Sequence, residues 1–595
     1  MSNAPVAGLI QRPLIQVKGT KISEKAANLL IDCRTSQTVG SAGQAVLRWL
    51  DMDYSLVDST LVSVGDAITV GFGSDHNNVS TVFEGTVATI GLETGPGDEP
   101  ILTVTAYDKG FKIGRNSVSK VWANQSYGDI LRAIAGTAGL SLVAPSTSLK
   151  FEHTMQLIDD LTMLDLIATR LGCVWYVDGS KLTLAEPTAT GAAKVTLEMR
   201  AALRRFKAQS NISDISQSVT VRGWDAKSKV AIVGTDSAAP AASSTAPILE
   251  STRTKAKSAA ASKRVTVRSV LSASEAKDLA KSLHRRSSAE ELHMRGECDG
   301  TPTVKLGSIV DIKGVGTKLS GKYYLTSVEH VYTTSDYRTR FESGGTKPSR
   351  LVDLFESGAA TERPSTGPFI GTVTEVGAGE FEGRVKVSLP AFGESVASTW
   401  ARVVSVGAGP KRGLMVLPSI SDEVLVMFED ADLRRPVVLG GLWNGKDKPP
   451  KAVVAKQSKL QEWVMKSPLG HTLTFRDGDS PDKKNVEIAL SDTSIKLHIG
   501  EDKVELHAKS GKPLELKSGS ASIVFSSSGD VTIKGNKVTI SASTNVEVKG
   551  GANAEVKAGA ALTLKGGAKA ELAGPMVDVK GDGMTNVKGG IVKIN

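Results

Sequence analysis

A short repeat near the C-terminus constrains the fold of this chain more than any other feature. Apolar residues two apart recur there in steps of seven or eight residues, and the repeats start at Val531, Val538, Val546, Ala554, Leu562, Ala570, Val577 and Thr585. The third residue of each unit is apolar, and these positions are Ile533, Ile540, Val548, Val556, Leu564, Leu572, Val579 and Val587. The pattern predicts an even stack of very short strands with glycine at many of the corners between them.

A unit of eight residues is too short to bury its own apolar side chains, and it cannot complete the turn of an ordinary single-chain β-helix. We therefore expect three chains to wind about one axis, each adding one strand per layer, so that every inward Val, Ile or Leu meets its two symmetry mates. This predicts a homotrimer with an intertwined triple-stranded β-helix over residues 466–595. Units upstream of 531, such as 486–490 and 523–525, are expected to continue the pattern in a looser form.

The remaining residues suffice for several domains, because the chain has 595 residues. Short β-branched runs predict strands at 67–72, 82–87, 101–107, 173–177 and 181–185, and apolar residues at helical spacing predict helices at 127–138, 161–171 and 272–295. The segments 235–263 and 344–364 are poor in apolar periodicity and predict linkers or exposed loops. The fold class expected is mainly β with some α, and residues 1–360 are expected to form an α+β region containing β-barrels.

A compact run of strand patterns lies between the second linker and the repeat. Five short β-rich segments separated by Gly and Asp turns fall within residues 369–444. Five short strands in about 75 residues match the size of a small five-stranded barrel of the OB type. We therefore expect an OB-fold barrel over residues 366–446.

Composition excludes several classes of protein. Hydrophobic residues make up 40% and charged residues 23%, and no apolar run approaches the length of a membrane-spanning helix. No secretory signal pattern opens the chain, so we expect synthesis in the cytoplasm. The net charge of +9 is spread along the chain, which argues against a nucleic-acid partner. Cys33, Cys173 and Cys298 are too far apart for a CxxC site, so neither a disulfide framework nor a zinc site is expected.

The barrel segment resembles a known family. Its motif residues are Gly383, Arg384, Trp400, Arg402, Glu423, Pro436, Gly440 and Asn444. In order and spacing they are similar to the OB domain of spike proteins of contractile injection systems. That family includes the VgrG spikes of type VI secretion, the spikes of contractile phages, and those of extracellular particles such as the antifeeding prophage and the Photorhabdus virulence cassettes. Residues 164–184 look like the hub of phage late-control proteins and of the extracellular particles, so we favour that type. A type VI spike and a phage baseplate spike stay open.

The resemblance implies a structural trimer at the tip of an inner tube. The hub would match the tube's symmetry to the three-fold spike, the OB domain would form a neck, and the needle would puncture the target envelope, contacting its membrane transiently. The end of the chain, Ile591, Val592, Lys593, Ile594 and Asn595, would seat a PAAR-type tip protein, since open strand edges otherwise invite aggregation. Other implied partners are inner-tube and baseplate proteins and separate effector cargo. The assembled particle would be extracellular on release.

Catalytic and metal-binding interpretations find little support. The chain has no HExxH, GxSxG or Walker motif, and the pairs Asp159-Asp160 and Glu290-Glu291 are interpreted as capping or solvated charges. His498 and His507 alternate with apolar residues and are expected to point outward. His471 shares the phase of Leu473 and Phe475 and could face an axis, yet a hydrogen-bonded or solvated role is favoured. We expect no enzyme activity, no cofactor and no metal.

A trimeric β-helical adhesin is the alternative outside the spike family. Such a fibre needs the same repeat, but it does not need the barrel motif, and it normally carries a receptor-binding head after the needle. In this sequence the last residues still belong to the repeat. The spike is therefore the favoured interpretation.

Overall fold

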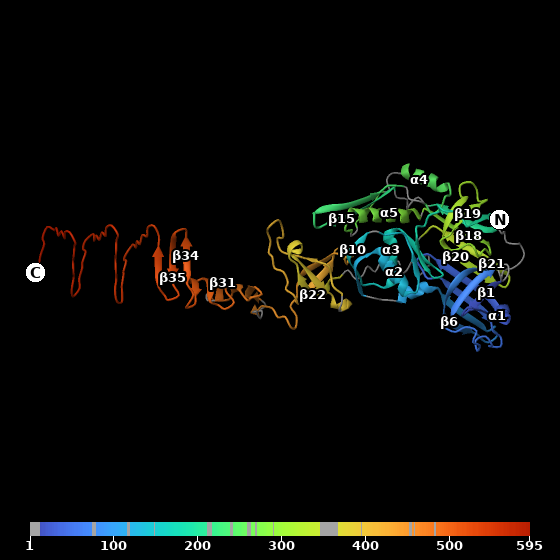
Figure 1. The fold of residues 1–595 in the computed structure, drawn as a ribbon, viewed down its shortest axis with the longest axis horizontal. Helices are drawn as coiled ribbons and strands as arrows, with labels where there is room; N and C mark the ends of the chain where they lie inside the picture. Colours follow the sequence, from blue (N-terminus) through green and yellow to red (C-terminus); the bar gives the residue numbers. More distant parts are fainter. Residues whose placement is uncertain are drawn as a thin grey trace. The chain divides into compact units, whose positions relative to one another are not determined.

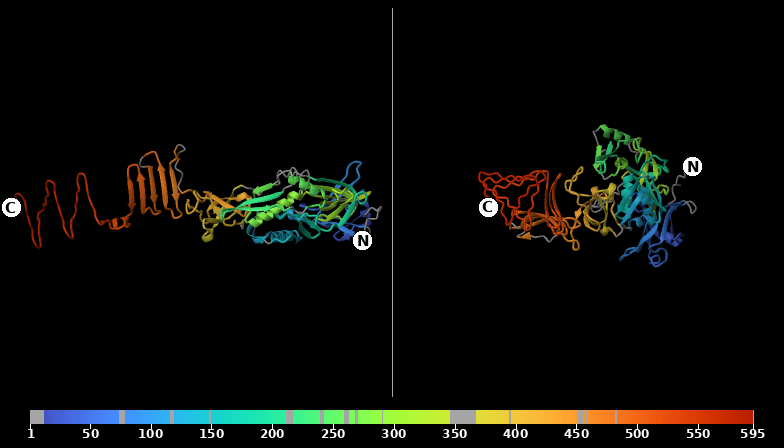
Figure 2. Two further views of the ribbon diagram at one scale, coloured as in Figure 1. Left: turned by 90° about the horizontal axis from the view of Figure 1, so that it is seen from above. Right: turned by 60° about the vertical axis from the view of Figure 1, so that its left-hand side comes forward.

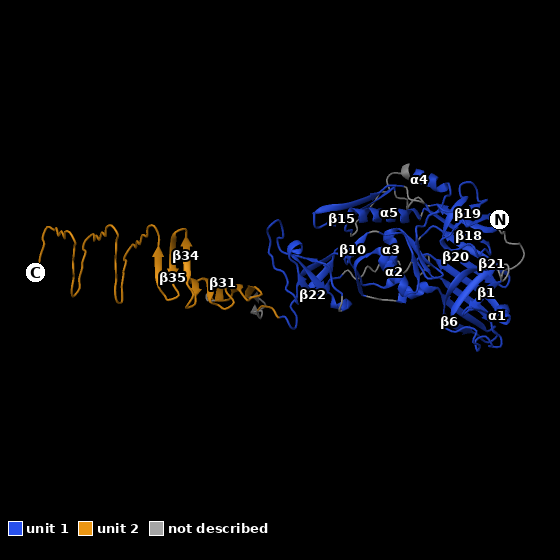
Figure 3. Cartoon of the chain, in the orientation of Figure 1, with its two compact units in different colours: residues 1–447 blue, residues 448–595 orange. Residues whose placement is uncertain are grey.

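The computed structural model describes residues 12–594 except 74–78, 116–118, 148, 211–216, 239–241, 259–262, 268–269, 290, 346–366, 394–395, 451–454, 457–458 and 481–482. The chain divides into two compact units, residues 1–447 and 448–595 (Figure 3). Among the described residues, no helix is long and apolar enough to cross a membrane.

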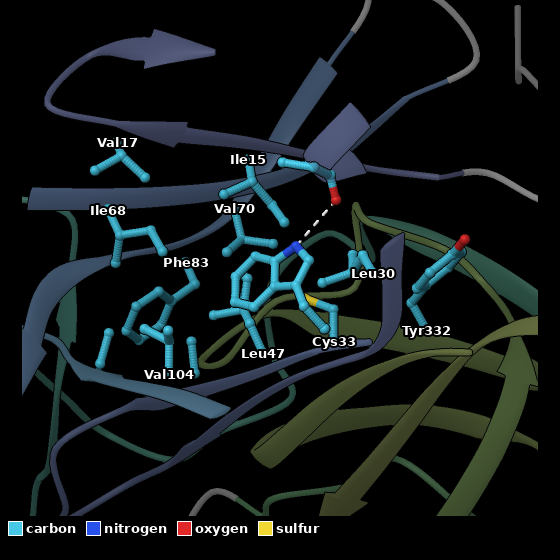
Figure 4. Packing of buried hydrophobic residues seen from close by; sticks show 14 of the residues in the cluster. Ile15, Val17, Leu30, Cys33, Leu47, Ile68, Val70, Phe83, Val104 and Tyr332 are labelled. Carbon is cyan, nitrogen blue, oxygen red and sulfur yellow. Dashed lines mark hydrogen bonds between the residues drawn. The ribbon is translucent and has the colours of Figure 1, made fainter. Parts of the chain in front are cut away.

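The N-terminal part of the first unit is a strongly bent β-structure with one short helix. Its elements are β1 (Pro13–Val17), β2 (Thr20–Lys21), α1 (Glu24–Leu29), β3 (Leu30–Thr38), β4 (Gln44–Leu50), β5 (Ala67–Gly73), β6 (Val79–Glu93) and β7 (Ile101–Tyr107). The strands predicted at 67–72, 82–87 and 101–107 are confirmed as parts of β5, β6 and β7, and every second residue of β7 is buried. Trp49 lies in the core and its indole N–H donates to the carbonyl of Ala26 at 3.1 Å (Figure 4).

A second β-structure follows much later in the chain and joins the first edge to edge. Its strands are β13 (Val195–Glu198), β14 (Leu203–Ser210), β18 (Leu292–Asp299), β19 (Ile309–Lys313), β20 (Gly321–Thr333) and β21 (Asp336–Ser343). The order β14-β18-β21-β20-β3-β4-β7-β6-β5-β1-β2 makes one continuous sheet, with β19 pairing β13 and β20. The antiparallel pairing of β20 with β3 is the seam between the two halves.

An α/β lobe lies between these halves in the sequence. It contains η1 (Lys109–Arg115), β8 (Lys120–Ser126), α2 (Tyr127–Thr137), β9 (Ser141–Val143), β10 (Lys150–Gln156), α3 (Asp160–Leu171), β11 (Val174–Asp178) and β12 (Lys181–Ala185). Both predicted helices are confirmed. Asp159 caps α3 by accepting the Thr162 N–H at 2.9 Å, and Gly172 ends it with φ of 67°. Asp160 accepts a hydrogen bond from Gln156 at 2.6 Å, so this carboxylate pair has structural roles.

A small sheet covered by one long helix corrects two sequence predictions. Its elements are β15 (Ser218–Asp225), β16 (Val230–Asp236), α4 (Ile248–Ser258), β17 (Lys263–Val267) and α5 (Ala273–Ala289). The predicted linker at 235–263 is wrong in part, because it contains α4, and Ala246 and Leu249 are buried in the core of the second β-structure. The helix predicted to reach 295 ends at Ala289, since burial alternates with a period of two from Leu292 onward and forms β18. Its predicted start is confirmed, because Ser272 accepts the Glu275 N–H at 3.1 Å.

The last part of the first unit is the small barrel predicted from the sequence. It consists of β22 (Phe369–Val376), β23 (Arg384–Ser388), β24 (Ala401–Val403), β25 (Glu423–Phe428) and β26 (Pro436–Gly441), with short 3-10 turns η2 (Gly379–Phe381), η3 (Pro390–Phe392) and η4 (Glu429–Ala431). The five strands close in the order β22-β23-β24-β26-β25. Buried Val, Leu and Ala side chains from all five strands fill it.

The second unit consists of antiparallel strands followed by an open coil. Its strands are β27 (Ala455–Lys456), β28 (Lys459–Leu460), β29 (Glu462–Lys466), β30 (Thr472–Asp477), β31 (Lys484–Ala489), β32 (Ile495–Gly500), β33 (Val504–Ala508), β34 (Leu514–Ser518), β35 (Ala521–Phe525) and β36 (Val531–Lys534). Strands β29–β33 form one sheet in sequence order (Figure 2, orange), and β34–β36 form another. After β36 the chain runs back and forth in wide turns (Figure 1, red). The expectation that units upstream of 531 are loose octads is wrong for 462–508, which form an antiparallel meander.

Candidate assembly surface

One face of the sheet β29–β33 is largely apolar, with Asp477 and Lys484 at its edge. In-register cross-strand neighbours form two rows on this face. The first row is Trp463, Phe475, Val486, Ile499 and Val504, and the second is Met465, Leu473, Ile488, Leu497 and Leu506. Each row crosses all five strands, and alternation along a strand places both rows on the same side of the sheet. We call these ten residues the apolar sheet face.

The apolar sheet face is uncovered in a single copy of the chain. Trp463 is 65% exposed and Val504 is 70% exposed, and Met465, Phe475, Ile488, Ile499 and Leu506 are also exposed. A contiguous apolar patch of this size on a soluble protein marks an interaction surface.

The opposite face of the same sheet is polar and internally paired. Arg476 donates to Asn485 at 2.8 Å and lies 3.2 Å from Glu487, which is on the next strand. His498 is 4.0 Å from Glu487 on this polar side, and its outward direction from a trimer axis stays a prediction. The sheet therefore has one polar, internally paired face, on which Thr474 and Asn485 are buried, and one apolar face that lacks a cover.

The repeat residues lie beyond this sheet, in the open coil. Bends recur at residues 536, 543–544, 551–552, 559–560, 567–568, 574–575, 582–583 and 590–591. Their spacing of seven or eight residues agrees with the predicted corners. No regular strand is present between 535 and 594, so the predicted short strands do not form within one copy of the chain.

The proposed axial residues are solvent-exposed in one copy and belong to no buried cluster of the described residues. Their exposed fractions lie between 55% and 81%, for Ile533, Ile540, Val548, Val556, Leu564, Leu572, Val579 and Val587. At the end of the chain, Ile591, Val592, Lys593 and Ile594 are exposed as well, and Asn595 lies outside the described residues. One copy of the chain thus brings none of these residues together.

Charged residues of the coil pair with each other on the side away from the apolar ones. Lys549 lies 2.8 Å from Glu547, Lys557 lies 2.6 Å from Glu555, and Lys580 lies 2.8 Å from Asp578. Partners two residues apart share a face of an extended chain, so Val546 and Val548 share the other face. These exposed pairs contribute little to stability, but they separate a charged side from an apolar side.

The histidines of this unit are arranged as hydrogen-bonding or surface groups. The ring Nδ1 of His471 accepts the backbone N–H of Ser491 at 3.1 Å, which agrees with the favoured hydrogen-bonded role. His507 lies 3.8 Å from Glu505 on the polar face. Among the residues that the structure describes, no group of three or more His, Cys, Asp or Glu side chains is placed to hold a metal ion.

The barrel motif residues hold the barrel together. Trp400 stacks on Phe381 with ring centroids 4.8 Å apart, and Lys386 Nζ lies 4.7 Å from the Trp400 ring. Gly383 has φ of 77° in the turn before β23, a conformation that favours glycine. Arg384 pairs in register with Arg402 across β23 and β24.

Other motif residues lie at the ends of β25 and β26. Asn444 donates to Glu423 at 3.1 Å and so links the chain after β26 to the start of β25. Arg402 forms an ion pair with Glu429. Pro436 is the first residue of β26, and Gly440 lies opposite Leu425 beside a register shift. These contacts give the motif a structural role.

A buried charge cluster links the barrel to α5, and no sequence motif indicated it. Arg434 Nη1 lies 2.9 Å from Glu275 Oε1, and Arg434 Nη2 lies 2.7 Å from Asp432. Arg170 of α3 also contacts Glu275 at 2.9 Å, and the Arg434 guanidinium lies 5.0 Å from the Phe151 ring centre. Burial tends to lower the pKa of Arg434, but the Asp432 carboxylate outweighs it and the pKa is raised.

Family models match most of the first unit. The model described as the Alg8 N-terminal domain matches residues 10–334, more than half of the chain, and the type VI secretion system/phage-baseplate injector OB domain matches residues 369–443. The chain belongs to the Alg8 N-terminal domain family, and its barrel matches the OB domain of type VI secretion and phage-baseplate injectors.

Curated relatives of the spike family match shorter stretches. The type VI secretion system spike protein VgrG1c of Pseudomonas aeruginosa is 25% identical over 181 residues, which cover 28% of this chain and 25% of the relative. VgrG2a of the same organism is 35% identical over 95 residues, which cover 15% of this chain and 11% of the relative. The chain thus spans about a quarter or less of the length of these two relatives.

Solved structures of similar fold include tail and spike proteins. The E. coli c3393 protein, a type VI secretion component, has a TM-score of 0.45 and 13% identity, covering 72% of this chain and 99% of that chain. The lidded Francisella PdpA–VgrG complex has a TM-score of 0.48 and 9% identity, covering 84% of this chain and 80% of that chain.

Proposed function

We propose that this chain is the central spike and hub of a contractile injection apparatus, and that it works as a homotrimer. The C-terminal unit supplies the needle, the OB barrel the neck, and the α+β region before residue 360 the hub that docks on the inner tube and baseplate. The family assignment and the uncovered apolar surfaces support this proposal together.

The observation that carries the trimer is the open coil at 535–594. No backbone hydrogen bond joins its successive passes among the described residues, and its apolar side is exposed. Unpaired backbone groups and apolar side chains both require partners. Strands from other copies, inserted between the passes, satisfy the two needs at once.

Three copies account for the geometry best. A chain that bends at every seventh or eighth residue encloses an axis, and a three-fold arrangement closes with one strand from each copy in every layer. The apolar sheet face then packs against its two symmetry mates around the same axis. Each large apolar side chain contributes about 1.5–3 kcal/mol on full burial, so ten per copy form a substantial core.

The needle end and the particle type complete the proposal. The exposed Ile591, Val592 and Ile594 provide strand edges and apolar surface on which a PAAR-type tip protein is seated. Contraction drives this tip through the target envelope and delivers separate effector cargo. We place the chain in an extracellular phage-tail-like particle, because residues 164–184 resemble the hub of such particles; a type VI spike and a phage baseplate spike are the alternatives.

Electron microscopy of particles from producing cells tests this function. Particles with the wild-type chain are expected to carry a three-fold density at one end of the tube, and this density is expected to shorten when residues 536–594 are deleted. Particles that assemble and deliver cargo normally without this chain would refute a spike role.

A further inference from the structure

A segment of the OB barrel projects as an apolar ribbon. Residues 404–420 connect β24 to β25, and we call them the barrel arm. The Leu414 N–H donates to the Val406 carbonyl at 3.0 Å, and Gly409 pairs with Arg412 at the tip, where Lys411 has φ of 53°. The arm is thus a hairpin-like ribbon held by hydrogen bonds at these two places, with no regular strand within 404–420.

The barrel arm carries apolar side chains that are uncovered. Val404 and Val406 lie on one segment of the arm, and Leu414 and Val416 lie on the other. Val404 is 56% exposed, Val406 77%, Leu414 46% and Val416 65%. A lone two-stranded ribbon is marginally stable in water, so these side chains need something to pack against.

The outer wall of the same barrel holds a second uncovered apolar patch. Ile370 on β22, Met427 on β25 and Leu439 on β26 point away from the barrel core and are exposed. These strands are neighbours in the closed barrel, with Ile370 opposite Leu425 and Met427 opposite Val437. We call Ile370, Met427 and Leu439 the barrel wall.

Charge makes the two surfaces complementary. The barrel arm carries two cations at its tip, Lys411 and Arg412, and no acidic residue. Strand β25 of the barrel wall has Asp422-Glu423 at one end and Glu429-Asp430 at the other, of which Glu423 and Glu429 already pair with Asn444, Arg402 and Arg435 within the barrel. An arm lying along the wall therefore brings a basic tip to an acidic border.

We propose that the barrel arm of one copy packs on the barrel wall of the next copy, so that three identical contacts close a ring at the neck. This inference rests on the proposed trimer. The contact joins different patches of the two copies and is therefore heterologous, and such contacts close into a ring when the rotation is three-fold.

A second copy is the occupant favoured by the structure. Within one copy the arm and the wall leave each other exposed, so the chain does not cover its own arm. The apolar sheet face begins at Trp463, and its strand β29 starts 21 residues after β26 ends (462 against 441). A trimeric C-terminal unit therefore tethers three barrels close to one another.

Disulfide trapping in the full-length chain tests the ring. The native cysteines Cys33, Cys173 and Cys298 are buried and free, so they interfere little. The pair Val416→Cys with Leu439→Cys is expected to give covalent trimers on a non-reducing gel after mild oxidation. The matched pair Met415→Cys with Leu439→Cys, with its arm cysteine moved by one residue, is expected to stay largely uncross-linked.

Native mass measurement of the same samples separates the possible failures. A trimer that forms no cross-link between copies, or that forms only a disulfide within one copy, would overturn the ring and leave the spike proposal standing. A monomer in native buffer would refute the proposed trimer itself. As a second measure, Val406→Asp is expected to lower the thermal midpoint of the neck relative to Met415→Asp, and equal midpoints would count against the ring.

Discussion

Arg434 Nη1 of the barrel lies 2.9 Å from Glu275 Oε1 at the start of α5, and both side chains are only 6% exposed. Asp432 forms the other half of the cluster. Burial tends to raise the pKa of Asp432, but the Arg434 guanidinium outweighs it, and the pKa is lowered below its usual 3.8. Buried ion pairs of Arg434 with Glu275 and with Asp432 therefore join the barrel to the hub, and each charge is buried next to its opposite.

Removing Arg434 should weaken this junction strongly. Arg434→Met leaves Glu275 and Asp432 buried with a cation missing, and breaking a buried pair in this way costs about 3–5 kcal/mol. Thermal unfolding should show a lower midpoint for the first unit. Arg295→Met is the matched control, because Arg295 pairs with Glu342 at 3.0 Å with both side chains exposed (62% and 42%), and an exposed pair contributes about 1 kcal/mol or less. Equal effects of the two substitutions would contradict the junction.

The hub should lose stability as the pH falls from 7 to 5. His330 is buried, its Nδ1 accepts from the Tyr337 hydroxyl at 3.0 Å, and its Nε2 lies 3.1 Å from the Val304 carbonyl. Burial lowers the pKa of His330 from 6.5 to about 4. The unfolded chain therefore binds a proton at His330 between pH 6.5 and pH 4 that the folded hub does not, and this group alone lowers the free energy of unfolding by about 2 kcal/mol between pH 7 and pH 5. Burial raises the pKa of Asp108 to about 6, which offsets part of that loss.

Urea unfolding at the two pH values measures this loss. His330→Gln should flatten the pH dependence of the hub transition, while His471→Gln, in the second unit, should leave it as in the wild type. The same pH dependence in the wild type and in His330→Gln would contradict the prediction.

Neighbouring glycines in the repeat should differ sharply in their tolerance of alanine. A Cβ added at Gly566 would overlap the Lys569 carbonyl, and one added at Gly550 would overlap the Asn553 carbonyl. At Gly567 and Gly551 nothing lies within 4 Å. Gly566→Ala should destabilise the needle by about 1–3 kcal/mol per copy, as overpacking does, and Gly567→Ala should be neutral. Circular dichroism melting of the full chain distinguishes the two, and the reverse order would refute the corner geometry.

Substitutions on the two sides of one repeat unit should have opposite outcomes. Val548→Asp would bury three carboxylates around the proposed axis without partners, which costs several kcal/mol. Lys549→Asp changes the adjacent residue on the charged side, where Lys549 pairs with Glu547, and should leave the needle intact. Limited proteolysis of the two variants measures how resistant the C-terminal unit is to cleavage in each. Equal resistance would contradict the assignment of the apolar side.

Local signals account for the parts of the fold that were predicted from the sequence. Helix α3 lies between the cap Asp159 and Gly172, both of which act within one turn of it. The barrel strands and the corners of the repeat depend on similarly local alternation and turns. In contrast, the pairing of β20 with β3 joins residues such as Thr38 and Ser327, which are 289 positions apart, and no local pattern specifies it.

The wrong predictions have physical causes too. Residues 462–508 alternate with the period of two that the octads also show, so alternation alone could not separate a meander from a stack. Their longer strands and the separating segments at 467–471, 478–480 and 490–494 were the signal that could have distinguished them. The contact between Arg434 and Glu275 had no such signal, because it depends on how the barrel packs against α5.

The mass of the intact chain in native buffer tests the proposed trimer most directly. We expect a single species of three times 62.4 kDa that persists on dilution, because the apolar sheet face and the repeat are covered only when three copies meet. A stable, folded species of 62.4 kDa would contradict the trimer.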